Sequence, residues 1–218
     1  MIVHDFSKQN SLVNQYISEV RDVSIQKDRM RFRKNMERIG EILSYEMSKT
    51  LEYQSATIKT PLGEKEILVP SSEIVLCSIL RAGIPLHQGI LNYFDKVENA
   101  FVSAYRHHPD GSDDFEVQVK YLASPSLEGK TLILADPMLA TGKTLENVLR
   151  ALEDIGMPKQ IHIISIIGAK PGIDLTDSVF PENTHLWIAA VDDALNERGY
   201  IVPGLGDAGD LCFGPRLD

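Results

Sequence analysis

The segment TLILADPMLATGKT, residues 131–144, decides how this chain folds and where its chemistry lies. Its apolar run Leu132–Ala135 ends at Asp136 and is followed by a loop of small residues, Ala140–Gly142. Directly after the loop, apolar residues recur at helical spacing, at Leu145, Val148, Leu149 and Leu152. We therefore predict a buried strand, a tight loop and the first turn of a helix in direct succession.

This succession of elements is suited to binding an anion. The N–H groups of the loop, the hydroxyls of Thr141 and Thr144 and the positive end of the helix dipole converge at the start of the helix. The carboxylate of Asp136 stands beside that point, where a phosphorylated sugar presents hydroxyl groups or a bound metal. The residues alone thus predict a phosphosugar site.

Further apolar runs alternate with helical patterns along the chain. The run Ile74–Leu80 is continuous, as in a strand buried on both faces of a sheet, and other predicted strands cover 97–105, 161–167 and 185–191. This alternation predicts an α/β fold with a doubly wound, mostly parallel sheet flanked by helices. Arg81, Arg106 and Asp136 each stand at the end of a predicted strand, and ligands of such sheets bind beyond the carboxyl ends of the strands.

The organisation of the chain is that of one unit. Because no repeat, low-complexity tract or linker divides it, we expect a single domain over residues 1–218. Residues 1–28 are polar and mixed and predict an N-terminal arm. Residues 107–121 predict a projecting polar β-hairpin that acts as a lid, and residues 56–69 a second hairpin around Pro61–Gly63.

Composition excludes several classes of function. A formal charge of −9 argues against a sequence-independent nucleic-acid binder, which would be basic. No apolar run approaches the length of a membrane span, and the N-terminus does not resemble a secretory signal, so we expect a cytoplasmic protein. Cys77 and Cys212 form no disulfide or metal-binding pattern.

Three motifs carry a resemblance to a known family. The acid-ended strand with its Thr-Gly-x-Thr loop resembles the phosphoribosyl-pyrophosphate loop of type I phosphoribosyltransferases, and DPMLATG looks like the version found in uracil phosphoribosyltransferases. The motifs Ile79–Gly83, ILRAG, and Gly199–Gly209, GYIVPGLGDAG, agree with that family in order and spacing. The similarity runs from about Arg31 to Gly214.

The resemblance implies a reaction of pyrimidine salvage: uracil and 5-phospho-α-D-ribose 1-diphosphate give UMP and diphosphate, with Mg²⁺ as cofactor. It implies catalytic roles for Asp136, Asp207 and Arg106. The donor-binding residues that it implies are Arg81, Arg106, Asp136, Pro137, Met138, Leu139, Ala140, Thr141, Gly142, Lys143, Thr144 and Asp207. Mg²⁺ would be held through the substrate, with Asp207 reaching it through water, and no residue is implied as a direct ligand.

The glycine-rich segment 199–214 is implied to form a hood over the base. Its uracil-binding residues would be Ile201, Gly206, Asp207 and Ala208, which read the pyrimidine edge with main-chain groups. The resemblance further implies a homodimer or larger homo-oligomer, and GTP as an effector in some members of the family.

One departure from the family pattern keeps alternatives open. Lys143 stands where the family usually has glycine, in Gly-Gly-Ser, so a non-catalytic relative that senses phosphoribosyl pyrophosphate or UMP is the alternative function. Gly-Lys-Thr is also the end of a P-loop, but the first glycine of that motif would fall at Pro137, which has no N–H to offer a phosphate. Another base, such as hypoxanthine, is the alternative within the family.

The histidines offer no second site. His107 and His108 show no metal-ligand spacing, and His162 and His185 fall in or near predicted strands, which favours structural roles. We assign no role to His87.

Overall fold

A computed structural model describes residues 1–107 and 116–216, with the backbone alone for residues 104–107 and 116–118. Within these residues, eight strands form one sheet: β1 (Ile2–Asp5), β4 (Ile74–Leu80), β5 (Glu98–His107), β6 (Glu116–Ala123), β7 (Thr131–Ala135), β8 (Met138–Leu139), β9 (Gln160–Ala169) and β10 (His185–Asp192). Their order is β1-β10-β9-β7-β4-β5-β6, with the short β8 beside β9. All described pairings in this sheet are parallel except that of β5 with β6, which confirms the predicted doubly wound, mostly parallel class.

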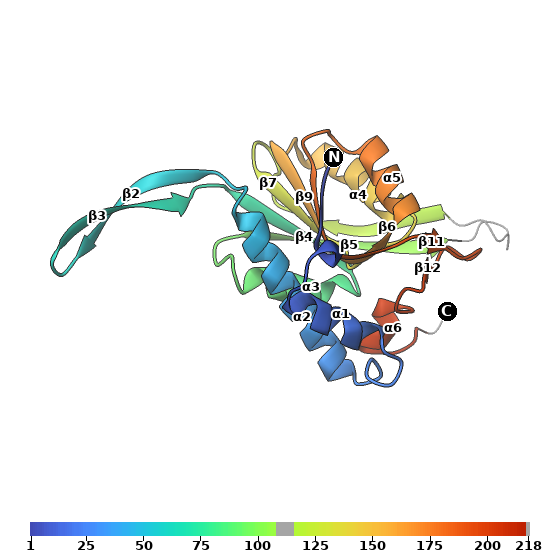
Figure 1. Cartoon of the computed structure of the whole chain (residues 1–218). Helices are drawn as coiled ribbons and strands as arrows, with labels where there is room; N and C mark the ends of the chain where they lie inside the picture. The colour runs from blue at the N-terminus through green and yellow to red at the C-terminus, as the bar shows by residue number, and fades with distance from the viewer. Residues whose placement is uncertain (108–115, 217–218) are drawn as a thin grey trace.

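Helices cover both faces of the sheet (Figure 1). One face packs against α1 (Leu12–Arg21), α2 (Arg29–Ser48), α3 (Gly83–Leu91) and α6 (Ala208–Phe213). The other face packs against α4 (Lys143–Leu152) and α5 (Lys170–Val179). Two short 3₁₀ helices lie at Phe6–Lys8 and Glu153–Ile155.

The central strand β7 is apolar from Leu132 to Ala135 because helices cover both faces of the sheet there. Leu132 and Leu134 belong to the core under α4, whereas Ile133 and Ala135 belong to the core under α2 and α3. Because successive side chains of a strand point to opposite faces, a strand covered on both sides needs an apolar residue at every position. Each of these four side chains is at most 1% exposed.

The strand order fixes where a ligand can bind. From β4 the chain moves outward to β5 and β6, then returns to β7 on the other side of β4 and proceeds outward through β9 to β10. The order therefore reverses between β4 and β7, which pair in parallel with Ser78 opposite Ala135. Crevices that bind ligands form at such a reversal, beyond the carboxyl ends of the two strands.

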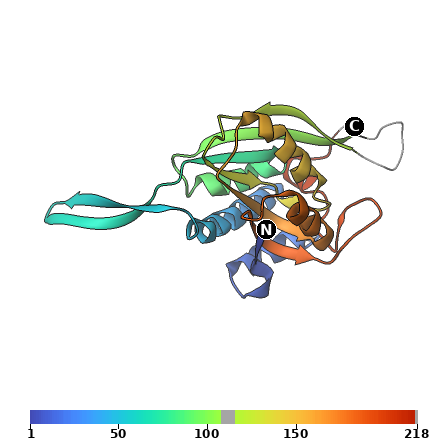
Figure 2. The same ribbon diagram turned by 90° about the horizontal axis from the view of Figure 1, so that it is seen from above.

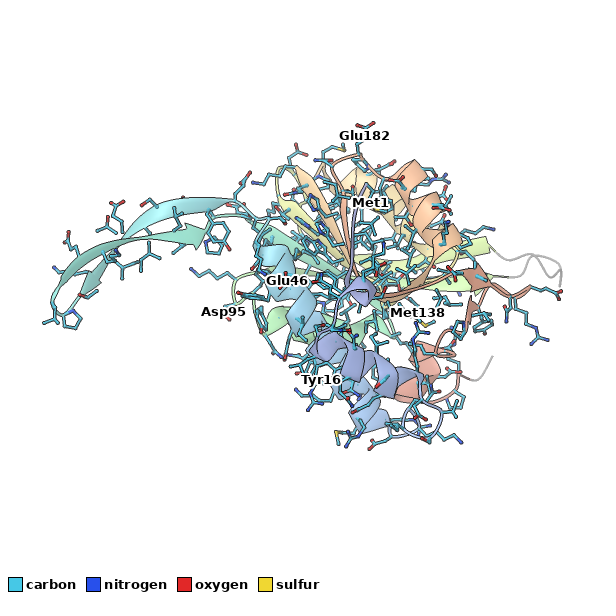
Figure 3. All side chains as sticks on the ribbon, viewed as in Figure 1. Met1, Tyr16, Glu46, Asp95, Met138 and Glu182 are labelled. Atoms are coloured by element: carbon cyan, nitrogen blue, oxygen red, sulfur yellow. The ribbon has the colours of Figure 1, made fainter. Side chains whose placement is uncertain are left out.

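A two-stranded arm leaves the body of the molecule. In the described part of the chain, strands β2 (Tyr53–Thr60) and β3 (Gly63–Pro70) pair only with each other, from Tyr53 opposite Pro70 to the turn. The arm extends well beyond the sheet in both views (Figures 1 and 2), and its side chains stand in open space on either side (Figure 3). The structure thus places the projecting hairpin at residues 53–70.

The segment predicted as a lid, residues 107–121, is described only at its two ends. Strands β5 and β6 pair antiparallel at the edge of the main sheet, with Arg106 opposite Val117. Within the predicted 107–121 hairpin, residues 108–115 lie outside the described part of the chain.

The N-terminal 28 residues are built into the body. β1 adds an edge strand beside β10, and α1 buries Val13 and Val20 against the core under α2. Among the residues that the structure describes, no helix combines the length and the apolar character needed to cross a membrane.

Candidate functional site

A cleft of about 430 Å³ opens beyond the carboxyl ends of β4 and β7. Its walls come from the three segments that the sequence singles out, at residues 79–82, 136–144 and 199–209. The lining residues are Ile79, Leu80, Arg81, Ala82, Ser103, Asp136, Pro137, Met138, Leu139, Ala140, Thr141, Gly142, Thr144, Gly199, Tyr200, Ile201, Gly206, Asp207, Ala208, Gly209 and Arg216.

Asp136 is the buried acid of the cleft. It follows β7 directly and is 8% exposed, and its Oδ1 accepts a hydrogen bond of 3.2 Å from the Met138 N–H. The Ser165 hydroxyl donates to its carbonyl oxygen and so fixes the backbone here. Burial raises the pKa of Asp136 to about 7, and the hydrogen bond from Met138 opposes that rise.

The loop after Asp136 turns into α4 at a left-handed glycine. Gly142, the N-cap of α4, has φ 81°, a conformation that costs glycine little and other residues more. A Cβ atom there would lie 2.9 Å from the Gly172 carbonyl oxygen and 3.2 Å from the Leu175 side chain. Glycine is therefore required at 142 both by the backbone and by the packing of α5 against the loop.

Lys143, the departure from the family pattern, occupies a position that tolerates it. It is the first residue of α4, so its backbone is helical, and its side chain is exposed. Its N–H lies 3.4 Å from the Thr141 Oγ1. It does not appear among the residues that line the cleft, whereas its neighbours Gly142 and Thr144 do.

Arg81 enters the cleft from the end of β4. Its guanidinium donates to Asp210 Oδ1 at 2.8 Å and to the Gly214 carbonyl at 3.2 Å, so it joins the loop after β4 to α6. The Leu80–Arg81 peptide bond is cis. An anion that binds Arg81 in the cleft competes with Asp210 for the same guanidinium.

The glycine-rich segment forms the opposite wall. Strand β12 (Ile201–Val202) pairs with β11 (Ala194–Leu195), and the chain then turns through Gly206, φ 94°, into α6. Asp207 caps α6, with its Oδ1 accepting from the Asp210 N–H at 2.9 Å. A Cβ built on Gly209 would lie 3.1 Å from Asp207 Oδ1 and 3.4 Å from Arg81 Nη2, so these two charged groups are near neighbours.

The structure brings most of the predicted site residues together. Arg81, Asp136, Pro137, Met138, Leu139, Ala140, Thr141, Gly142, Thr144, Ile201, Gly206, Asp207 and Ala208 all line the one cleft. Arg106 lies in β5, but its side chain is outside the described part of the chain. Sequence reasoning missed Asp210 as the partner of Arg81, and also Ser103, Tyr200 and Arg216 in the lining.

The histidines that the structure describes with side chains do not line the cleft. His4, His162 and His185 gather around Trp187 on β1, β9 and β10, with His4 Nε2 3.0 Å from His185 Nδ1. Burial, and then the neighbouring His185, lower the pKa of His162 to about 3. Among the described residues, no group of three or more His, Cys, Asp or Glu side chains could hold a metal ion.

Comparison with known sequences gives one consistent result. Residues 7–215 match the sequence model of a family described as uracil phosphoribosyltransferase. A protein of that name from Porphyromonas gingivalis is 51% identical over 216 residues, which cover 99% of each chain. A protein of the same name from Thermococcus gammatolerans is 37% identical over 213 residues, which cover 96% of this chain and 92% of that one.

Solved structures extend this similarity to the fold. The AQ2163 protein from Aquifex aeolicus is 29% identical, with a TM-score of 0.86 and 98% of each chain covered. A hypoxanthine phosphoribosyltransferase from Staphylococcus aureus superposes with a TM-score of 0.50 over 86% of this chain and 84% of that one. At 15% identity the latter shows a shared fold and nothing further.

Proposed function

The chain belongs to the uracil phosphoribosyltransferase family, and from this premise we propose that it converts uracil and 5-phospho-α-D-ribose 1-diphosphate to UMP and diphosphate. One observation carries the proposal beyond family membership. The phosphate loop, the Arg81 loop and the glycine-rich segment line the same cleft, as a bisubstrate reaction requires. Segments around positions 81, 136 and 207, far apart in the sequence, thus meet at one cleft.

The loop 137–144 and Asp136 would hold the donor sugar. The N–H groups at the start of α4 and the Thr141 and Thr144 hydroxyls suit a 5′-phosphate, which carries close to two negative charges near neutral pH. The Asp136 carboxylate would accept from the ribose hydroxyls. Arg81, with Arg106, would bind the diphosphate, since a guanidinium fork matches phosphate oxygens.

The glycine-rich segment would read the base. Ile201, Gly206 and Ala208 line the cleft, and main-chain donors and acceptors at fixed positions suit the O4, N3–H and O2 groups of uracil. Cytosine reverses the donor and acceptor pattern at two of these positions and would leave buried groups unpaired, which discriminates strongly. This wall therefore favours uracil over cytosine.

Chemistry at the cleft rests on positioning and charge. As the uracil nitrogen attacks C1 of the ribose and diphosphate leaves, positive charge develops on the sugar ring and negative charge on the leaving group. Asp136 and Asp207 would face the positive charge on the ring. Arg81 and Arg106 would offset the negative charge on the diphosphate. The described residues present no acidic cluster for Mg²⁺, so the ion would be held through the donor, with Asp207 contacting it through water and the ion neutralising part of the diphosphate charge.

The direct test is incorporation of radiolabelled uracil into UMP by the purified protein, with donor and Mg²⁺ each present or omitted. We expect product only when both are present, and the same assay with and without GTP tests whether GTP is an effector. Absence of UMP under all these conditions would reject the proposal. Neither the sensing alternative nor the P-loop alternative gains support, because the named relatives are transferases and Pro137 breaks the P-loop pattern.

Exchange of Lys143 for glycine is expected to change kcat/KM for the donor by less than about threefold. The side chain is exposed on the first turn of α4 and does not line the cleft, and surface changes away from special features have small effects. Steady-state kinetics of the wild type and the Lys143→Gly variant measure this. A rise in activity of about tenfold or more in the variant would show instead that the lysine obstructs the loop.

We also propose that the β2–β3 arm makes the chain a homodimer or larger homo-oligomer. The arm exposes Ile58, Leu62, Ile67 and Leu68, which are between 40% and 99% exposed. A two-stranded hairpin is at best marginally stable by itself, so apolar side chains on such an arm are suited to packing against another copy.

Paired exchange of Ile58 and Ile67 for threonine tests this assembly. Both side chains lie on one face of the arm, since Ala56 pairs with Ile67 and Ile58 follows two residues later, and threonine keeps the β-branch while adding a hydroxyl. We expect light scattering to show a shift toward monomer. Exchange of the exposed Met157 on the body for serine is the control, and an unchanged mass in the arm variant would contradict the proposal.

A further inference from the structure

The wall that reads the base is held from outside the cleft by an ion pair. Arg21, the last residue of α1, donates from Nη1 and Nη2 to the two carboxylate oxygens of Asp192, each at 2.8 Å. Asp192 ends β10. The two residues are 171 positions apart in sequence, and neither lines the cleft.

This pair forms hydrogen bonds with both main-chain polar groups of one residue in the glycine-rich segment. The N–H of Gly204 donates to Asp192 Oδ2 at 3.0 Å, and its carbonyl accepts from Arg21 Nη1 at 3.1 Å. Gly204 has φ 60°, and a Cβ there would overlap the carbonyl oxygen of Ile201. The segment therefore passes through one fixed turn, and the ion pair recognises that turn.

The residue held by the ion pair, Gly204, lies two positions before a residue that lines the cleft. Only Leu205, 6% exposed and part of the core, separates Gly204 from Gly206, which lines the cleft. A second brace from the same N-terminal segment holds Leu205, whose carbonyl accepts from Gln26 Nε2 at 3.3 Å. Downstream of these contacts the chain continues directly into Asp207 and Ala208.

The pair is protected enough to act as a fixed support. Its side chains are 23% and 9% exposed, so it is screened less than a surface pair. Two parallel hydrogen bonds between a guanidinium and a carboxylate fix the relative orientation of the two groups as well as the distance between them. Lysine cannot reproduce this geometry, because its ammonium is a single point charge.

We propose that Arg21 and Asp192 are positioning residues for the nucleobase: by holding Gly204 they set the main-chain groups that read uracil, and so determine uracil affinity from outside the cleft. The inference rests on the proposed function for the identity of the base. It gives Arg21, which is far in sequence from all three motifs, a role in substrate recognition.

The variants Arg21→Lys and Asp192→Asn test this role, with Arg31→Lys as the matched control. Arg31, on α2, pairs with Glu19 of α1 at 3.2 Å and not with Asp192, so the control makes the same substitution while leaving the contacts of Gly204 intact. We expect uracil KM to rise about tenfold or more in both test variants, because the main-chain groups that bind the base must then be ordered at the cost of binding free energy. KM for the donor and kcat should stay within about threefold.

Hydrogen exchange of the amides at residues 199–209, measured without substrates, provides a readout that does not depend on turnover. We expect faster exchange there in both test variants and not in Arg31→Lys. Unchanged exchange and unchanged uracil KM in either folded variant would overturn the inference. So would a parallel loss in kcat and both KM values, which marks a general loss of structure. Failure of the wild type to form UMP rejects the proposed function instead, and hydrogen exchange still decides whether the ion pair holds the segment.

Discussion

Exchange of Gly142 for alanine is expected to lower kcat/KM for phosphoribosyl pyrophosphate by about a hundredfold or more. The left-handed conformation at φ 81° costs alanine roughly 1–2 kcal/mol. More importantly, the new Cβ would lie 2.9 Å from the Gly172 carbonyl oxygen, a backbone atom that cannot rotate away. The loop 140–144 must then shift relative to the rest of the cleft, and a displacement of ~1 Å is enough for a loss of this size.

Gly129→Ala is the matched control for this prediction. Gly129 also has a positive φ, 68°, but a Cβ there meets nothing within 4 Å, and the residue does not line the cleft. This variant carries the same kind of backbone penalty without the clash, so we expect a lower thermal midpoint and unchanged kinetics. If both variants lose activity equally, or if Gly142→Ala keeps wild-type kinetics, the loop does not hold the donor as described.

Exchange of Asp136 for asparagine is expected to reduce kcat/KM for the donor by about a hundredfold while leaving the fold intact. Asparagine is isosteric, and its side-chain oxygen can still accept the hydrogen bond from the Met138 N–H. It cannot supply a negative charge to the ribose hydroxyls or to the positive charge that develops on the ring. Steady-state kinetics at about pH 8, above the raised pKa of the carboxyl, measure the loss. Near-wild-type activity would contradict a role for the carboxylate.

The same variant should be more stable than the wild type at alkaline pH. Because burial raises the folded-state pKa of Asp136 to about 7, the folded protein holds a proton that the unfolded chain releases near pH 4. The stability contributed by the neutral carboxyl is fully present below about pH 4 and is lost as pH rises through about 7. The Asp136→Asn variant carries no such penalty, so thermal midpoints should agree at about pH 4 and separate by about pH 8, where the free energies of unfolding differ by on the order of 4 kcal/mol at most.

Activity has the opposite dependence on pH. The ionised carboxylate is the form that accepts from ribose hydroxyls, so kcat/KM for the donor should rise as pH passes about 7. A phosphate of the donor itself titrates near pH 6. Comparison with Asp136→Asn separates the two groups, because only the donor's titration remains in the variant.

The sequence predicted those parts of the site that depend on local pattern. The alternation of apolar runs and helices predicted the parallel sheet, and the position of Arg81 and Asp136 at strand ends predicted that they would share an edge. Both predictions need only the periodicity of each element and the rule for where parallel sheets bind ligands. The fold class was therefore within reach of periodicity alone, whereas the family came from the resemblance of the three motifs.

Contacts between segments far apart in the sequence could not be predicted from local pattern. Nothing in the local pattern around Arg21 points to Asp192 or Gly204, and Asp210 stands 129 residues from the arginine that it binds. The size of the arm was missed for a related reason. The turn at Pro61–Gly63 predicts a hairpin over residues 56–69, but only the tertiary structure shows that both faces of the arm are largely exposed.

Lys143 illustrates how a local rule can mislead. A bulky residue in a glycine-rich phosphate loop threatens the loop only where the backbone is left-handed, and here that conformation belongs to Gly142. The helix begins one residue later, where lysine is an ordinary occupant. The departure from the family pattern therefore falls one position away from the residue that the loop cannot change.

The ion pair between Arg81 and Asp210 links the loop after β4 to the helix that begins at the glycine-rich wall. If the donor binds Arg81 as proposed and draws the guanidinium away, Asp210 loses its counterion, and the helix that carries this carboxylate begins at the glycine-rich wall of the cleft. Thermodynamic linkage makes such coupling reciprocal, so whatever donor binding does to the affinity for the base, the base does equally to the affinity for the donor. In that case one arginine would let the binding of each substrate change the affinity for the other.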